Sequence, residues 1–258
     1  MNPTATSIER SGTTVKIDAS GVYYRDLNTV LREVVTGDVE RIDLVNICGQ
    51  RYIGTDLGRE VEINIHGTPG NDLGAFMDGP RINVYGNAQD GCGNTMNEGE
   101  IVIHGHAGDI TGFSMRGGKI FIRDNVGYRV GIHMKQYLSK VPSLVIGGTA
   151  QDFLGEYMAG GILVVLGLNL RAGETHKANF IGTGMHAGVM YIRGSVERHQ
   201  LGKEVGIVEL NEQDRENLDL LVAEFANHFG YDAKEILAGD FIKLLPLSLR
   251  PYGRLYAY

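Results

Sequence analysis

Carboxylate and amide side chains recur at one position of a repeated pattern along the chain, where their oxygen atoms could bind a cation. The row consists of Asn71, Asp90, Asp109, Tyr128, Asp152 and Asn179. Stacked oxygen ligands could bind Ca²⁺, as in other β-helix repeats. Asn and Asp also stabilise tight corners through hydrogen bonds to local backbone groups. Because Tyr128 interrupts the row, we favour corner capping and expect no metal site here.

Two histidines form a second candidate metal site. His104 and His106 are two residues apart, so they would lie on the same side of a strand. Neither has a cysteine or a carboxylate in register, and the eight histidines of the chain include no HxxH or HExxH pair. The sequence therefore predicts no metal-ligating residue.

Two short motifs resemble nucleotide-binding or catalytic signatures. Gly182–Ala187 reads GTGMHA and matches GxGxxA, but this fingerprint binds phosphate only where it opens a helix. The residues that follow, Val189–Ile192, belong to a strand of the repeat. Ser114 follows Gly112 as in an esterase elbow, yet Arg116 occupies the place of the second glycine. We predict no catalytic and no cofactor-binding residue in this chain.

A repeat positions all of these residues. Six of the eight methionines form one column, and each has a glycine three residues before it. A small or turn residue follows most of the methionines, and then an apolar pair two residues apart. The column consists of Met77, Met96, Met115, Met134, Met158 and Met185, and the glycines are Gly74, Gly93, Gly112, Gly131, Gly155 and Gly182.

The period of the repeat is 19 residues, as from Gly67 to Gly86 and from Gly86 to Gly105. A propeller blade needs about 40–45 residues, whereas an apolar pair at i, i+2 has strand spacing. The sequence predicts a mainly β fold, a single-stranded right-handed parallel β-helix of about seven rungs. Insertions at Lys135–Pro142 and Asn169–Asn179 interrupt the fourth and sixth copies.

The segments on either side of the repeat are predicted to cap it, because bare β-helix ends would pair with other strands. Residues 1–45 should form a small α/β cap, with a strand at Thr14–Ile17 and a helix at about Asp26–Val35 closed by Gly37. Residues 46–200 should form the β-helix. All segments belong to one structural domain.

Residues 201–258 are predicted to form a helical cap and an extended tail. The helices are expected at about Asn211–His228 and at Ala233–Leu237, and the tail at Phe241–Tyr258. In the tail, Arg and Tyr alternate with small or apolar residues, which suits a partner contact; a second cap is the alternative. The alternating residues are Arg250, Tyr252, Arg254, Tyr256 and Tyr258.

Charged residues of the corners and insertions are expected to form a solvated face. They are Arg129, Lys135, Arg171, Glu174, His176 and Lys177. A second interpretation makes the insertion Asn169–Asn179 a docking loop for a partner.

Composition excludes several classes of protein. The net charge of −7 argues against nucleic acid and anionic membranes, which need clustered Lys and Arg. Cys48 and Cys92 form no CxxC pair and are typical of reduced, small apolar residues. We find no signal-peptide pattern and no apolar run of about 18 residues. A cytoplasmic location is therefore expected.

The string GEYMAGGILVVLG at Gly155–Gly167, with the repeated G-x-x-M-x-x-G spacing, resembles the GXGXG domain at the C-terminus of the glutamate synthase large subunit. AKEIL at Ala233–Leu237 and FIKLLP at Phe241–Pro246 follow in the order of that family. The ending from Arg250 resembles the free-standing form of this domain in split glutamate synthases. The resemblance covers roughly residues 46–258. One component of formylmethanofuran dehydrogenase is similar to the same β-helix.

The resemblance implies a non-catalytic scaffold in a glutamate synthase-type complex. The expected partners are a glutamine amidotransferase subunit and a synthase subunit that carries FMN and an iron–sulfur cluster, and the chain itself would bind no cofactor. It has no cysteine near its start to act as a nucleophile and too few cysteines for a cluster. A homo-oligomer is also compatible.

Two alternatives stay open. The first is a sister complex, N-methylglutamate synthase or formylmethanofuran dehydrogenase. The second is an independent β-helix enzyme that acts on a polysaccharide or an ester, which would need clustered carboxylates on one outer face.

Overall fold

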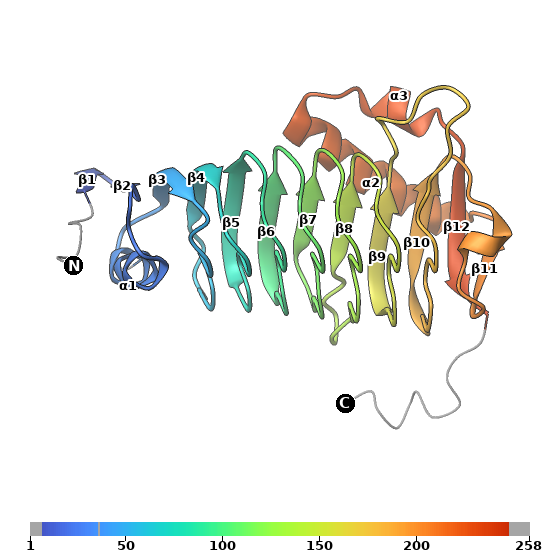
Figure 1. Ribbon diagram of the computed structural model, residues 1–258, viewed down its shortest axis with the longest axis horizontal. Coiled ribbons are helices and arrows are strands. Elements are labelled where there is room, and N and C mark those ends of the chain that lie inside the picture. The colour runs from blue at the N-terminus through green and yellow to red at the C-terminus, as the bar shows by residue number, and fades with distance from the viewer. Residues whose placement is uncertain (1–6, 36, 248–258) are drawn as a thin grey trace.

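The chain forms a twelve-stranded sheet wound into a solenoid, with helices at both ends (Figure 1). This computed structural model describes residues 7–35 and 37–247. The strands are β1 (Ser7–Ser11), β2 (Thr14–Asp18), β3 (Arg41–Cys48), β4 (Glu62–Thr68), β5 (Asp78–Tyr85), β6 (Glu98–Ile103), β7 (Lys119–Ile122), β8 (Ser143–Ile146), β9 (Ala159–Val165), β10 (Ala187–Arg193), β11 (Val205–Val208) and β12 (Phe241–Pro246). The helices are α1 (Tyr24–Val34), η1 (Arg198–Gln200), α2 (Glu212–Phe229) and α3 (Ala233–Leu237).

Parallel pairing between successive rungs confirms the predicted β-solenoid. Strands β2 to β10 follow one another in sequence order and are all parallel. The register follows the repeat, since Ile63 pairs with Ile82, Ile82 with Ile101, and Ile101 with Ile120. Equivalent residues of neighbouring rungs therefore lie one above the other.

The methionine column lies inside the solenoid, as predicted. All six methionines are at most 1% exposed, and the apolar pairs of the strands are buried beside them. The glycine column allows this packing: Gly112 has φ +73°, and a Cβ there would lie 2.7 Å from Cδ1 of Leu144. Methionine fills such irregular interiors because its side chain is flexible and unbranched.

Each rung contains one regular strand. The remainder of the rung is a turn in which alternate residues have positive φ, five, three and one residue before the methionine. In the fifth rung these are Phe153 (64°), Gly155 (63°) and Tyr157 (52°). A left-handed residue at every second position prevents an extended strand from continuing.

The regular solenoid is slightly shorter than the seven rungs predicted from the sequence. Six glycine–methionine turns repeat, and the degenerate copy at Gly54 joins them to the N-terminal cap. The cap agrees closely with its prediction. The predicted strand is β2, which pairs parallel with β3 and antiparallel with β1, and the predicted helix is α1.

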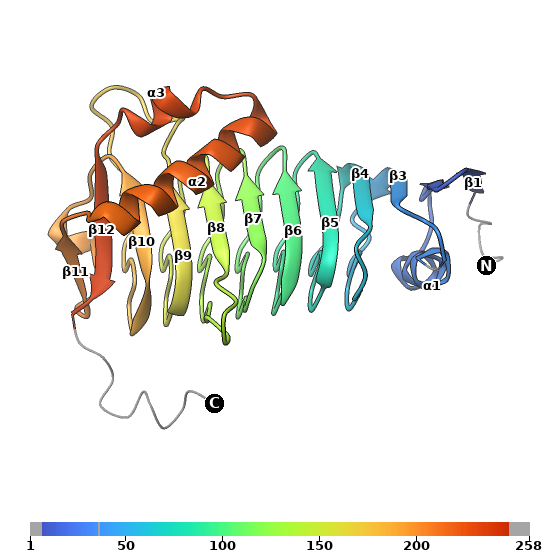
Figure 2. The same ribbon diagram turned by 180° about the vertical axis from the view of Figure 1, so that it is seen from behind.

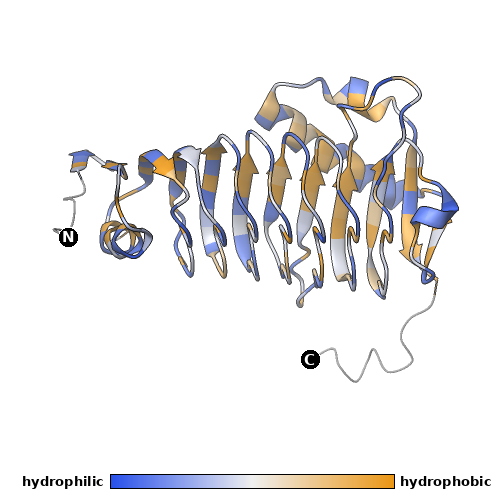
Figure 3. Ribbon diagram, in the orientation of Figure 1, coloured by the Kyte–Doolittle hydropathy of each residue, from blue (hydrophilic) through white to orange (hydrophobic). Residues whose placement is uncertain are grey.

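Helix α2 covers one face of the solenoid and buries a second apolar core. In Figure 2 it crosses the strands diagonally, and Figure 3 shows apolar strand surface in this region. Leu218, Leu221, Val222 and Phe225 of α2 pack there. The strands contribute Val102, Phe121, Val145, Val164, Leu166 and Tyr191.

Caps at both ends explain why α2 forms where the sequence predicts. The side chain of Asn211 accepts a hydrogen bond from the N–H of Asp214, and the Asp214 side chain accepts one from the N–H of Asn211. This is a reciprocal capping box. Gly230 ends the helix in the left-handed conformation, with φ +74°.

Strands β12 and β11 close the C-terminal end of the sheet, with β12 antiparallel to both β10 and β11. The predicted partner-binding tail, Arg250–Tyr258, lies outside the described residues. Within the described residues, we find no helix with the length and apolar character needed to cross a bilayer.

Candidate functional site

The carboxylate row holds neighbouring rungs together. Oδ1 of Asp90 accepts a hydrogen bond from the backbone N–H of Asp109 at 2.9 Å, and Oδ1 of Asp109 accepts one from Tyr128 at 2.8 Å. Oδ1 of Asp152 accepts from the N–H of Asn179 at 2.7 Å. The predicted corner capping is present, but the donor is the backbone of the next rung and not a local group.

His106 belongs to a second row of the same kind. Oδ1 of Asn87 accepts from the N–H of His106, and Nδ1 of His106 accepts from the N–H of Asn125 at 3.2 Å. Oδ1 of Asn125 then accepts from the N–H of Thr149. The imidazole therefore occupies an asparagine position and supplies an acceptor for the backbone.

His104 has a different environment. Its ring stacks on Tyr85 at 5.0 Å, Tyr85 stacks on His66, and the edge of Phe229 closes the row at 5.1 Å. Burial and the nearby positive charges of Arg123 and His228 lower the pKa of His104. The structure places His104 and His106 in separate rows. The described part of the chain contains no group of three or more His, Cys, Asp or Glu residues that could hold a metal ion.

The two motifs singled out in the sequence are turns of the solenoid. Residues 182–187 lead into β10, so this glycine-rich segment opens a strand and not a helix. A Cβ on Gly184 would meet the ring of Tyr157 at 2.4 Å, which explains that glycine by packing. Ser114 is a left-handed turn residue, and its N–H donates to the carbonyl of Ile132 in the next rung.

Most residues of the predicted solvated face are exposed, but His176 is not. Its side chain lies under the insertion with 4% exposure, and Nε2 donates to the carbonyl of Arg193 at 2.9 Å. The backbone of His176 also contributes, because its carbonyl accepts a hydrogen bond from Nε2 of Gln200. Burial lowers the pKa of the imidazole. The expectation failed here because His176 turns inward and hydrogen-bonds to Arg193 and Gln200.

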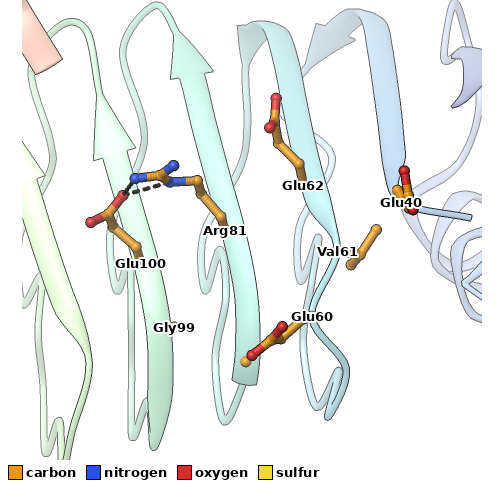
Figure 4. A pocket seen from close by; sticks show the side chains of 8 residues that line it. Glu40, Glu60, Val61, Glu62, Arg81, Gly99 and Glu100 are labelled. Carbon is orange, nitrogen blue, oxygen red and sulfur yellow. Dashed lines mark hydrogen bonds and ion pairs between the residues drawn. The ribbon is translucent and has the colours of Figure 1, made fainter.

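A groove with several carboxylates was missed in the sequence. Glu40, Glu60, Glu62 and Glu100 line a space of about 450 Å³ together with Arg81 (Figure 4). Glu62, Arg81 and Glu100 are 19 residues apart, and they pair across β4, β5 and β6. Reading charges along the repeat would have revealed this column, which alternates in sign from Arg41 to Lys119.

Glu100 of this groove is paired with two neighbouring cations. Nε of Arg81 donates to Oε1 of Glu100 at 2.7 Å, and Nε2 of His228 lies 3.6 Å from the same oxygen. Burial raises the pKa of Glu100, but the hydrogen bonds from His228 and Arg81 outweigh it, so that the net pKa lies below its ordinary value. A general acid requires the opposite shift. Glu100 is thus held as a paired carboxylate by Arg81 and His228.

A surface ridge of aromatic and charged side chains lies on three consecutive turns. We call Arg129, His133, Phe153, Tyr157 and Phe180 the aromatic ridge. Phe153 stacks on Phe180 at 4.9 Å, the guanidinium of Arg129 lies 4.9 Å over Phe153, and His133 stacks on Tyr157 at 5.3 Å. All five residues have left-handed backbones, and Phe180 is 52% exposed.

A buried carboxylate lies beneath this ridge. Glu156 is 6% exposed, and its Oε2 lies 3.1 Å from a guanidinium nitrogen of Arg129. Despite this ion pair, Oε2 accepts no well-oriented hydrogen bond from the described residues. The ridge thus combines exposed aromatic rings with an arginine held by charge, a composition typical of protein–protein contacts.

Comparison with known proteins identifies the family. The GXGXG motif family matches residues 32–247, so the chain belongs to this family. A relative in Methanocaldococcus jannaschii, the uncharacterized protein MJ1350, is 48% identical over 250 residues. The match covers 94% of this chain and 96% of the relative. The family is the one indicated by the glycine–methionine repeat.

Proposed function

We propose that the chain is a non-catalytic scaffold subunit of a glutamate synthase-type complex. It would hold a glutamine amidotransferase subunit and a synthase subunit so that ammonia passes from one to the other. The observation that carries this proposal is the extent of the family match, which runs from within α1 to the end of β12. The chain is thus a GXGXG domain together with its helical cap.

The side chains of this chain do not fit an iron–sulfur cluster. Such clusters are held by several cysteine thiolates, and the chain has two cysteines, Cys48 and Cys92. Burial raises the pKa of Cys92 to about 12, which keeps it a thiol. We therefore assign the cluster, and FMN with it, to the synthase subunit.

The aromatic ridge supports a contact role. Exposed aromatic rings and arginine are enriched in the central anchors of interfaces, and the five ridge side chains stand on left-handed turn residues of the kind that every rung repeats. Five such backbones within three turns fix the positions of these side chains. A rigid, pre-positioned surface is what a scaffold needs.

The test is co-expression of this chain with an amidotransferase-type subunit and an FMN/iron–sulfur synthase-type subunit. We expect a three-component complex that forms glutamate from glutamine and 2-oxoglutarate, while the chain alone shows no turnover. Turnover by the isolated chain, or full activity of the other two subunits without it, would refute the scaffold role. Neighbouring molybdopterin or tungstopterin subunits would instead assign the chain to a methanofuran-type complex.

A paired substitution tests the aromatic ridge within that complex. Phe180→Ala should weaken assembly, because it removes an exposed ring stacked on Phe153. Phe76→Ala is the matched control, since Phe76 is also a left-handed turn residue with 51% exposure but lies on a distant rung. Equal effects of the two substitutions would argue against a specific role of the ridge.

A further inference from the structure

The net charge of the protein is concentrated in one segment. Residues 203–240 contain ten acidic and three basic residues, a net charge of −7, which equals that of the whole chain. The remaining 220 residues are therefore neutral overall. This segment comprises β11, at the C-terminal end of the solenoid, and α2 and α3, which lie along one side of it (Figure 2).

Among the described residues, ion pairs involve two of the ten carboxylates. Asp214 is buried and pairs with Lys243, and Glu224 pairs with Lys119 through both oxygens at 2.6 and 2.7 Å. The other eight are exposed, and we call them the acidic face. They are Glu204, Glu209, Glu212, Glu216, Asp219, Asp232, Glu235 and Asp240.

Helix α2 presents the centre of the acidic face. Glu212, Glu216 and Asp219 are four and three residues apart, so they lie on one side of the helix. Leu220, next to them, is 57% exposed although it is a large apolar residue. Its exposure distinguishes this side from an ordinary solvated helix, which has polar side chains on its outer face.

A groove runs beside these carboxylates, between α2 and the segment that leads from α3 into β12. It has a volume of about 350 Å³ and is lined by Leu218, Leu237 and Phe241. Its charged lining residues are Asp219, Asp240 and Arg215, so the carboxylates outnumber the one cation. The groove could therefore receive an apolar stem that ends in a positive charge, as in lysine and arginine side chains.

We propose that the acidic face docks a lysine- and arginine-rich surface of a partner protein subunit. The inference rests on the proposed scaffold function and specifies where one partner binds and what its surface contains. Opposite charge selects this occupant and accelerates its association. A second copy of the chain would bring two faces of the same sign together, which opposes association.

The test compares two charge-matched triple variants in the co-expressed complex. Glu212→Gln/Glu216→Gln/Asp219→Asn removes three charges from the acidic face, and Glu9→Gln/Glu40→Gln/Glu60→Gln removes three at the N-terminal end. Binding to each purified partner subunit is measured between about 0.05 and 0.5 M salt. We expect the first variant to lose about tenfold in affinity for one partner at low salt, with a flatter salt dependence.

The outcomes separate the two proposals. If both variants bind alike, or if binding of the unmodified chain does not depend on salt, the acidic face is not the docking surface. If the unmodified chain forms no complex with either subunit, the scaffold function itself is wrong and the inference fails with it. Carbodiimide coupling provides an independent measurement, because it should join α2 carboxylates to partner lysines. Coupling found only at other sites would also overturn the proposal.

Discussion

Nζ of Lys243 lies 2.6 Å from Oδ2 of Asp214, and both residues are almost fully buried. The hydroxyl of Tyr191 donates to the other carboxylate oxygen at 2.7 Å. Burial raises the pKa of Asp214, but hydrogen bonds from the N–H of Asn211, from Lys243 and from Tyr191 outweigh it and lower the net pKa. This network joins α2 to β10 and β12.

Removing one member of this pair should destabilise the protein strongly. Asp214→Ala leaves the Lys243 ammonium buried without a partner, and we expect a loss of about 3–5 kcal/mol in the free energy of unfolding. The double variant Asp214→Ala/Lys243→Met should recover part of the lost free energy of unfolding. Urea unfolding measures both, and Asp78→Asn is the control, because its exposed pair with Lys140 should contribute less than about 1 kcal/mol. If Asp214→Ala loses no more stability than Asp78→Asn, the network does not hold α2 in place.

Acidification should destabilise the protein partly through His176. Burial lowers the pKa of this imidazole in the folded state below its ordinary value of 6.5. The unfolded chain therefore binds the proton first, and the stability contributed by neutral His176 is complete above about pH 6.5 and lost as the pH falls. His104 contributes with the same sign.

The measurement is the urea midpoint at several pH values between about 5 and 8. His176→Gln retains a donor for the carbonyl of Arg193 and should flatten the acid side of this curve. His199→Gln, at an exposed residue, should leave the curve unchanged. A curve equally steep in His176→Gln would contradict the prediction.

The methionine column should tolerate shape changes but not charge. Met115 is fully buried, so Met115→Asp places a carboxylate in the apolar interior and should prevent folding. Met115→Leu nearly conserves volume and should cost less than about 1.5 kcal/mol. Circular dichroism and thermal unfolding of the two variants test this. A Met115→Asp protein as stable as the original chain would be incompatible with the register of the solenoid.

Thiol chemistry should distinguish the two cysteines. Cys48 is exposed, whereas Cys92 is buried with its pKa raised to about 12. Because the thiolate is the reactive form, a disulfide reagent should label one thiol per chain in the native protein and both in denaturant. The folded Cys48→Ser variant should react with the reagent slowly or not at all. Rapid labelling of Cys92 would indicate that the solenoid opens locally.

The sequence was sufficient for the solenoid because its constraints repeat. Each rung needs a glycine where a Cβ would meet a neighbouring side chain, and a methionine three residues later, so six copies reinforce one another. Helix α2 was predictable because its cap residues, Asn211 and Gly230, are local signals. The left-handed backbones at Phe153 and Tyr157 were not predictable, because nothing in those side chains favours positive φ.

The contacts in the candidate surfaces join residues that are far apart in the sequence, so no local sequence pattern predicts them. Lys243 and Asp214 are 29 residues apart and meet only because β12 returns beside β10. His176 was misjudged because the burial of an insertion depends on how the loop folds. The alternation of charge from Arg41 to Lys119 was accessible from the repeat, but it required reading polar columns as carefully as apolar ones.

The hydrogen bonds between corner side chains and the next rung point in one direction along the chain. In the two rows that contain Asp90 and His106 the acceptor precedes the donor: the carboxylate of Asp90 is synthesised before the amide of Asp109 that it binds. A finished rung therefore offers the emerging chain an acceptor that is already in place. Solenoid stability comes mainly from neighbouring repeats, so the rod can grow in step with translation. Helix α2 follows β10 in the chain and then packs on strands that are already in place.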